Sequence, residues 1–281
     1  MPTVQITEFT DPGCPFAFSA EPMRRRLDWL FGDQLGWTVV MVGLAQTGAD
    51  YDGKGFTTEV MAQAFKKIAA DHGMPIDSAE RPRMAATVPA CKAVVAVRLH
   101  APAATRTILR ALRVRHFAGD LLDAPETLAA AARDAGLDPE QVARWADGDD
   151  VQAALADDMH RARHPHPAAL AQDHKLAAWD GGRRYTCPSY EMTDGDQESA
   201  LVAAGFQPLA AYEVLLANLD PGLRRRASTD DVAEVLAWAG EPLATKEVAM
   251  VCELEMPEAR ERLARVATER PVGSDGYWSL A

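Results

Sequence analysis

Cysteine is scarce in this sequence, and its few copies stand far apart. The 281 residues include four cysteines, which are Cys14, Cys91, Cys187 and Cys252. None of them shares the short spacing that a zinc site or a disulfide framework requires. The pattern therefore predicts free thiols in a reducing compartment, the cytoplasm, and no metal site.

Positive charge and long hydrophobic runs are also lacking. The formal net charge is −12, whereas nucleic acids and anionic membranes attract basic surfaces. No apolar run approaches the roughly 20 residues of a membrane-spanning helix. The N-terminal residues MPTVQI lead straight into a predicted strand without a basic leader. We expect a protein that is not secreted and has no nucleic-acid or membrane partner. Abundant alanine, with more arginine than lysine, indicates a GC-rich bacterial genome.

The N-terminal part of the chain has the pattern of a βαβ unit. Residues 4–9 alternate between apolar and polar side chains, which predicts a strand. Residues 11–13 form a turn, and a helix follows over 15–31, in which Pro22 is expected to cause a kink or a restart. Residues 36–43 are apolar enough for a central strand. Two strands joined by a helix imply a parallel pair with a right-handed crossover.

Helical patterns fill the middle of the chain, and strands return after it. Between residues 55 and 179 the predicted helices cover 57–72, 88–100, 103–117, 125–135, 139–145 and 150–161. Strands are predicted at 185–192 and 199–203, with a hairpin turn at 193–197 and an amphipathic helix at 208–219. The order predicts an α/β fold with an inserted all-helical domain.

The C-terminal residues have the pattern of a small module of their own. A polar linker at 224–229 precedes three predicted helices and a hairpin, which cover 230–239, 245–253, 256–269 and 271–280, with Thr245 capping the second helix. This order resembles a winged helix. The predicted domains are therefore 1–54 with 180–222, 55–179, and 223–281.

The charge of this C-terminal module argues against DNA binding. Residues 222–281 contain eight Arg or Lys and eleven Asp or Glu. Phosphate contacts by basic residues supply most non-specific affinity for DNA. We therefore expect a docking, lid or homodimerisation role for the module.

Cys14 stands where a strand and turn meet a helix. Unpaired N–H groups and the macrodipole at a helix N-terminus stabilise an anion. Thiols in such sites have pKa values of roughly 3.5–7.5 instead of about 8.5. Cys14 is therefore a candidate nucleophile. The alternative is a buried structural cysteine, but such a residue would not need Asp-Pro-Gly before it and Pro15 after it.

The residues around Cys14 resemble a known active site. Residues 11–16, DPGCPF, resemble the Asp-Pro-x-Cys-Pro-Trp-x-Cys opening of the DsbA family, in particular its cytoplasmic FrnE-like branch. Residues 88–93, 137–139 and 185–190 resemble further stretches of that family, so the similarity covers roughly residues 3–222. It implies a thioredoxin fold interrupted by a helical domain, and an activity in thiol–disulfide exchange.

The resemblance also implies roles for individual residues. Cys14 would be the attacking cysteine and Pro188 the cis-proline of the thioredoxin fold, with Cys187 beside it on the opposite wall of the site. A cis-proline leaves the backbone of the preceding residue free to hold an extended substrate. The residues expected to bind the substrate are Pro15, Phe16, Thr186 and Arg184. From its position just before the cis-proline segment, Arg184 could hold the carboxylates of a glutathione-like thiol, lower the pKa of Cys14, or belong to a solvated basic turn with Arg183.

Ala17 departs from the family pattern, because the second cysteine of the Cys-x-x-Cys pair would stand there. The enzyme could use a low-molecular-weight thiol such as glutathione or mycothiol to resolve a mixed disulfide at Cys14. It could instead resemble the kappa-class glutathione transferases and isomerases, or bind a ligand or partner without redox activity. It could also be a thiol-responsive regulator that uses the C-terminal module. Finally, Cys187 could pair with Cys14, which requires Cα atoms within about 7 Å.

Other candidates have plainer interpretations. Ser19 is expected to be an ordinary helix residue, and Cys91 and Cys252 inert core residues. His164 and His166 lie among prolines in a loop without further ligands at metal-binding spacing. Phe16, Phe18 and Trp37 either line the pocket or fill the core.

Overall fold

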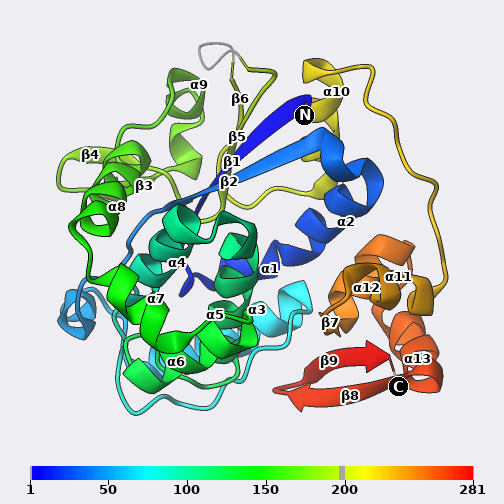
Figure 1. The fold of residues 1–281 in the computed structure, drawn as a ribbon, viewed down its shortest axis with the longest axis horizontal. Coiled ribbons are helices and arrows are strands. Elements are labelled where there is room, and N and C mark those ends of the chain that lie inside the picture. Colours follow the sequence, from blue (N-terminus) through cyan, green and yellow to red (C-terminus); the bar gives the residue numbers. More distant parts are fainter. Residues whose placement is uncertain (1, 196–199, 281) are drawn as a thin grey trace.

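A four-stranded sheet forms the centre of the molecule (Figure 1). The computed structural model describes residues 2–195 and 200–280. The strand order is β2-β1-β5-β6. β1 and β2 pair in parallel, and β5 pairs antiparallel with both β1 and β6. The first two strands and the intervening helices thus form the predicted βαβ unit.

The elements of this sheet domain come from both ends of the helical insert. Its strands are β1 (Val4–Thr10), β2 (Leu35–Met41), β5 (Ser189–Thr193) and β6 (Leu201–Ala203). Its helices are α1 (Pro15–Ser19), α2 (Glu21–Phe31), η1 (Gly32–Gln34) and α10 (Leu209–Leu219). The predicted helix over 15–31 is interrupted at Ala20, because Pro22 belongs to the first turn of a new helix.

The insert is mainly helical, as predicted. Its elements are η2 (Gly48–Tyr51), α3 (Thr58–His72), α4 (Val88–His100), η3 (Pro102–Ala104), α5 (Thr105–Phe117), α6 (Pro125–Asp134), α7 (Pro139–Ala146), α8 (Asp149–Ala162), α9 (Pro167–Leu170) and η4 (Asp173–Lys175). The prediction of helices alone is wrong at its end, where β3 (Ala177–Trp179) and β4 (Gly182–Arg184) form a two-stranded hairpin. These strands are too short to give a clear alternation in the sequence.

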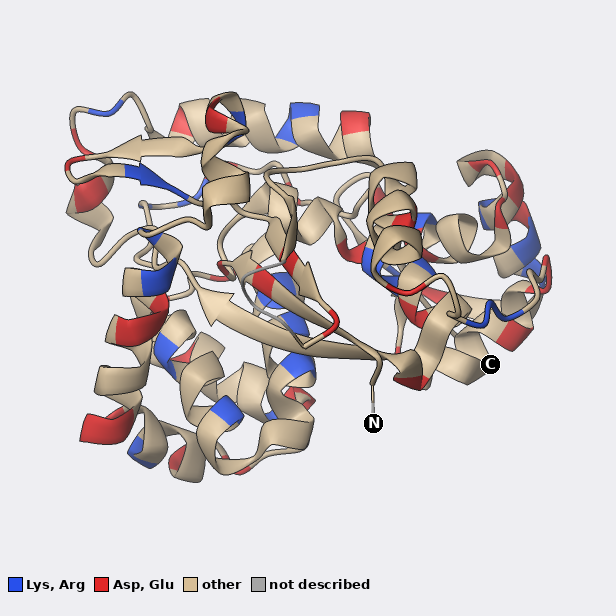
Figure 2. Ribbon diagram, turned by 90° about the horizontal axis from the view of Figure 1, so that it is seen from above, with Lys and Arg blue, Asp and Glu red and all other residues tan. Residues whose placement is uncertain are grey.

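The C-terminal unit consists of three helices and a small antiparallel sheet. Its elements are α11 (Val232–Ala239), β7 (Leu243–Ala244), α12 (Thr245–Cys252), α13 (Met256–Val266), β8 (Ala267–Val272) and β9 (Asp275–Leu280), with the strand order β7-β9-β8. Acidic and basic residues are mixed over this unit (Figure 2). Its classification as a winged helix and the three domain boundaries stay predictions.

One predicted cap in this unit is wrong. Ala244, not Thr245, is the N-cap of α12, and the Glu247 carboxylate accepts the Ala244 N–H at 2.8 Å. The hydroxyl of Thr245 instead donates to Asp275 and accepts from the Trp278 indole, both at 2.8 Å. The Thr245 side chain, which the sequence pattern predicts to be the cap, therefore makes tertiary hydrogen bonds instead.

Packing joins the C-terminal unit to the sheet domain. One hydrophobic cluster contains Leu27 of α2, Tyr190 of β5 and Val248 of α12. The linker is bound as well, since the Arg226 N–H donates to the Leu30 carbonyl at 2.8 Å. The C-terminal unit therefore packs against α2 and is not joined to the sheet domain by a flexible linker alone. Figure 1 shows it beside that helix.

The predicted turn at 193–197 lies partly outside the described residues, although the strands on either side of it do pair antiparallel. Among the helices of the described chain, none has the length and apolar character needed to cross a membrane.

Candidate active site around Cys14

Strand β1 and a tight turn carry Cys14 to the start of α1. The Cys14 N–H donates to the Asp11 carbonyl at 3.2 Å, which closes the turn. Cys14 itself is the N-cap of α1 with extended backbone angles, and Pro15 occupies the first helical position. The prediction that Cys14 stands at a helix N-terminus is confirmed. The helix spans only five residues, so its dipole alone is a weak source of stabilisation for an anion.

The opposite wall of the site is the segment before β5. The peptide bond between Cys187 and Pro188 is cis, as the resemblance implied. The Cys14 thiol donates a hydrogen bond to the Cys187 carbonyl oxygen of this segment at 3.2 Å. Cys14 and Cys187 are 6% and 8% exposed and share one hydrophobic cluster. The fold thus brings together two cysteines that are 173 positions apart.

The environment favours the Cys14 thiolate. The pKa of Cys14 is lowered, and the largest cause is the neighbouring Cys187 side chain. Burial opposes this, while the backbone N–H groups of Ala17 and Phe16 act in the same direction as Cys187. Burial raises the pKa of Cys187 well above its ordinary value, and the proximity of Cys14 adds to that rise. Of the two thiols, Cys14 is therefore the one that ionises more easily.

Asp11 is a functional candidate, although its place in the sequence identifies it only as a turn residue and part of the motif. Its carboxylate is fully buried and lies three positions before Cys14. It accepts hydrogen bonds from the backbone N–H groups of Gly13 (2.8 Å) and Leu44 (2.9 Å). The Thr87 hydroxyl (2.9 Å) and the Cys91 thiol (3.5 Å) also donate to it. Its donors come from three separate segments, which no local pattern in the sequence could have indicated.

Gly13 is required between Asp11 and Cys14 by close packing. A Cβ atom at this position would lie 2.7 Å from Cγ2 of Thr87 and 3.2 Å from Cδ1 of Leu122. The absence of a side chain lets the turn approach the start of α4. The insert therefore supports the Cys14 turn directly.

The residues expected to bind substrate lie around the two cysteines but differ in what they contact. The Phe16 side chain is 42% exposed, and its ring meets His72 of α3 edge-on. The Thr186 hydroxyl donates to the Lys175 carbonyl at 2.7 Å. Arg184 donates to the Tyr185 carbonyl at 2.8 Å, and its charge opposes the effect of burial on the pKa of Cys187. Substrate binding by Pro15, Phe16, Thr186 and Arg184 stays a prediction.

Several other candidates fill the core. Phe18 is fully buried and stacks on Phe117, and Trp37 packs against Tyr190. Cys91 and Cys252 are buried, and burial raises the pKa of each, that of Cys252 to about 11. High pKa values make both thiols poor nucleophiles.

The histidine pair and Ser19 have structural roles. His164 Nδ1 lies 2.8 Å from the His160 carbonyl, and His166 Nδ1 accepts the Ala168 N–H at the start of α9. Ser19 is buried within α1. Within residues 2–195 and 200–280, His, Cys, Asp and Glu side chains do not gather in groups of three or more that could hold a metal ion.

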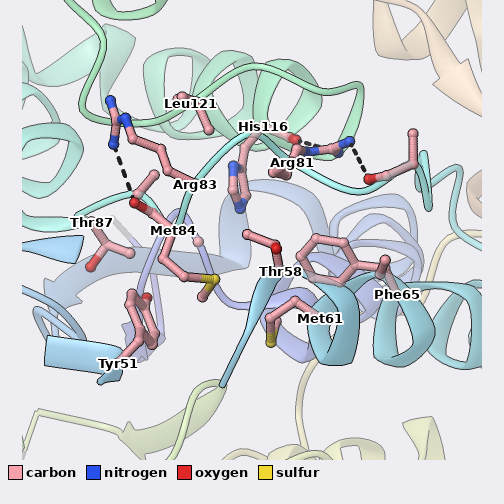
Figure 3. A pocket seen from close by; sticks show the side chains of 14 residues that line it. Tyr51, Thr58, Met61, Phe65, Arg81, Arg83, Met84, Thr87, His116 and Leu121 are labelled. Carbon is pink, nitrogen blue, oxygen red and sulfur yellow. Dashed lines mark hydrogen bonds between the residues drawn. The ribbon is translucent and has the colours of Figure 1, made fainter. Parts of the chain in front are cut away.

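A small pocket opens on the insert side of Gly13 (Figure 3). It encloses about 50 Å³, which is room for a few water molecules or a small side chain. Its walls include Tyr51, Met61 and Phe65, and the ring of His116 points into it. His116 Nδ1 lies 3.1 Å from the Asp120 carbonyl, and burial lowers the His116 pKa to about 4. A neutral imidazole with one nitrogen free of the backbone therefore faces the cavity.

Comparison with protein families identifies the fold that carries this site. The DSBA-like thioredoxin domain family matches residues 5–167, which is more than half of the chain. The chain belongs to this family. The thioredoxin fold with its inserted helical domain, predicted from the motif and the order of elements, is confirmed.

Individual relatives extend the comparison. Two proteins named ClpXP adapter protein SpxH match 98% of this chain: that of Halalkalibacterium halodurans is 24% identical over 88% of its length, and that of Shouchella clausii 26% identical over 86%. The cytosolic disulfide reductase DsbM of Pseudomonas aeruginosa superimposes on the present chain with a TM-score of 0.53 at 17% identity. The superposition covers 76% of the present chain and 99% of DsbM. That structural likeness shows the fold.

Proposed function

We propose that this protein is a thiol–disulfide oxidoreductase in which Cys14 is the nucleophile and a low-molecular-weight thiol supplies the electrons. The observation that carries the proposal is the position of Cys14, which is the N-cap of α1 and lies against the cis Cys187–Pro188 segment. In this environment the pKa of Cys14 is lowered, with the Cys187 side chain as the largest cause. A thiolate attacks disulfides, whereas a neutral thiol does not. The DsbM neighbour, named a cytosolic disulfide reductase, is consistent with this class of reaction.

The reaction begins with a mixed disulfide. The Cys14 thiolate attacks one sulfur of a substrate disulfide, so that one half becomes bonded to Cys14 and the other leaves as a thiolate. Ala17 carries no sulfur, so the pair that family members form within the first helical turn is absent here. Glutathione or mycothiol would then be the source of the reducing electrons. We infer that the protein works in the reducing cytoplasm, where all four cysteines stay free.

Two measurements test the proposal: formation of a mixed disulfide at Cys14 and the rate of catalysed disulfide reduction. Intact-mass analysis after incubation with oxidised glutathione, and separately with the disulfide of mycothiol, should give a product modified at Cys14. Reduction of a glutathionylated peptide by reduced glutathione should be accelerated by the protein and fall to the uncatalysed rate in Cys14→Ser. Cys252→Ala is the matched control, because it removes a thiol far from the site. A Cys14 that stays unmodified, together with a pKa at or above 8.5, would refute the proposal.

A second candidate function is suggested by the length of the adapter match. The two SpxH proteins match 98% of the chain, so the similarity includes the C-terminal unit. This favours a role in which the protein binds a partner protein and the C-terminal unit takes part in docking. DNA is not the expected partner. Arg260, Arg262 and Arg265 of α13 each pair with a carboxylate, so their charges are already neutralised within the protein.

The two candidates differ in their need for Cys14. An adapter should retain its partner when Cys14 is replaced by serine, whereas an oxidoreductase should lose turnover. Capture of mixed-disulfide partners by a Cys14-only protein, compared with non-covalent capture by Cys14→Ser, distinguishes them. A low-salt gel shift tests the expected lack of DNA binding.

A further inference from the structure

The site contains a second thiol that the exchange at Cys14 leaves without a chemical step. Cys187 is 8% exposed and lies in the same buried hydrophobic cluster as Cys14. The Cys14 Sγ lies 3.2 Å from the Cys187 carbonyl oxygen. This contact brings the Cys14 sulfur to the residue that carries the second thiol, and a disulfide between the two requires Cβ atoms about 3.5–4.5 Å apart.

The other two thiols are held elsewhere. Cys91 is fully buried on α4, and its thiol donates to the Asp11 carboxylate. Cys252 lies at the end of α12, in the cluster that joins the C-terminal unit to α2. Ala17 has no thiol to offer. Cys187 is thus the thiol placed to reach Cys14.

We propose that Cys187 is the resolving cysteine, which attacks the Cys14 sulfur of the mixed disulfide and forms a Cys14–Cys187 disulfide. The inference rests on the proposed role of Cys14 as nucleophile. It assigns to residue 187 the step that position 17 performs in a Cys-x-x-Cys protein.

Protons and electrons balance along this route. In the first step the Cys14 thiolate forms a bond to one half of the substrate disulfide and releases the other half as a thiolate, which can accept the proton of Cys187. In the second step the Cys187 thiolate attacks Cys14 Sγ and expels the remaining half of the substrate as a thiolate, which solvent protonates. The substrate disulfide has then gained two electrons, and the two protein thiols have lost them. Two molecules of a small thiol return these electrons by consecutive exchanges and leave as their own disulfide.

The same contact explains why Cys187 stays protonated until it is needed. The negative charge of the Cys14 thiolate contributes to the high pKa of Cys187. Once Cys14 is bonded to substrate that charge is gone, and the Cys187 proton leaves more easily. Cys14 therefore attacks first, and Cys187 attacks after the charge on Cys14 has been lost.

The experiment uses a chain in which Cys91→Ala and Cys252→Ala leave Cys14 and Cys187 as the sole thiols, with folding checked by circular dichroism. After a pulse of oxidised glutathione, we expect the protein to lose two hydrogens, to resist alkylation and to yield a cross-linked peptide pair containing residues 14 and 187. Adding Cys187→Ser should leave glutathione bound at Cys14, with release slowed at least about tenfold, because an intramolecular thiol acts at a high effective concentration.

A second variant separates resolution from tuning of the Cys14 pKa. Serine at position 187 keeps an O–H donor toward Cys14 and removes the sulfur, whereas Cys187→Ala removes both. The Cys14 pKa should stay low in the serine variant and rise in the alanine variant, while both variants retain the adduct. A parent protein that keeps glutathione on Cys14 as long as the serine variant does would refute the resolving role and leave the proposed function intact. If Cys14 forms no adduct in any variant, both proposals fail.

Discussion

At the scale of single residues, the buried carboxylate of Asp11 has two effects on Cys14. Four donors from the turn, the β2–α3 connection and the start of α4 converge on it. Its negative charge also raises the pKa of Cys14. Asp11 therefore holds the turn in place at the expense of some thiolate stability, which makes it a positioning residue.

Replacing Asp11 by asparagine separates these effects. The amide has one acceptor oxygen, so either the Gly13 or the Leu44 N–H loses its partner, and we expect unfolding to become easier by about 1–3 kcal/mol. Loss of the charge should lower the Cys14 pKa, which the pH dependence of thiolate absorbance measures. Thr87→Val is the control, because it removes a donor without removing charge. An equal change of the Cys14 pKa in both variants would show that displacement of the turn, not charge, controls the thiol.

His116 gives a prediction about pH. Its pKa of about 4 lies below the ordinary value of about 6.5. The fold therefore stabilises the neutral ring, so this contribution is complete above about pH 6.5 and is lost as the pH falls toward 4. Urea unfolding as a function of pH should show this loss, and nuclear magnetic resonance of the ring should give the low pKa directly. His116→Asn keeps a donor toward Asp120 and does not titrate in this range. An identical decline in that variant would contradict the assignment.

At the scale of elements, local patterns were sufficient where a segment is long and its periodicity clear. Helix α4 was predicted at its observed bounds, and the restart of the first helix followed from Pro22 alone. The β3–β4 hairpin was missed because each strand has three residues. The turn chemistry around Cys14 and the motif before Pro188 were visible in the sequence, but the contacts of Asp11 and the burial of the C-terminal unit against α2 depend on tertiary packing.

Helix α1 could carry a dithiol. Positions 14 and 17 are the N-cap and the third helical residue, so their side chains share one face of the first turn. In a Cys187→Ser background, Ala17→Cys should restore release of glutathione from Cys14, because the thiol introduced at position 17 can form a disulfide with Cys14. Position 17 is 1% exposed, so the added sulfur should cost about 1–3 kcal/mol of stability. Ala17→Ser adds similar volume without a thiol. Equal release rates in the cysteine and serine variants would indicate that the helix does not align the two positions for exchange.

At the scale of the whole molecule, buried ion pairs connect all three parts of the chain. Arg113 of α5 pairs with Glu8 of β1 at 3.0 Å and with Glu21 of α2. Arg110 of α5 reaches Glu247 of α12 at 2.7 Å. These side chains are at most 6% exposed. Buried charges are tolerated only when each has a partner, so the insert, the sheet domain and the C-terminal unit depend on one another for compensation.

Substitution of Glu247 tests whether the three parts of the chain depend on one another for charge compensation. It is fully buried and pairs with Arg110 and, at 3.3 Å, with Arg25 of α2. Burial alone would raise the pKa of Glu247, but the two arginines outweigh it and the pKa lies below its ordinary value. Glu247→Gln leaves both guanidinium groups short of negative charge, so we expect a loss of about 3–5 kcal/mol in the free energy of unfolding.

The control and the pH dependence distinguish a buried network from a surface effect. Glu258→Gln removes an exposed partner of Arg262 on α13 and should cost at most about 1 kcal/mol. Because the folded pKa of Glu247 is depressed, its contribution is complete above its unfolded value near 4.3 and is lost as the pH falls through the folded pKa. The difference in the free energy of unfolding between the parent and Glu247→Gln should therefore become smaller in acid. At neutral pH, proteolysis in the 224–229 linker should be faster in the variant. Equal stability of the two glutamine variants would mean that the buried ion pairs of Glu247 do not help to hold the C-terminal unit against α2.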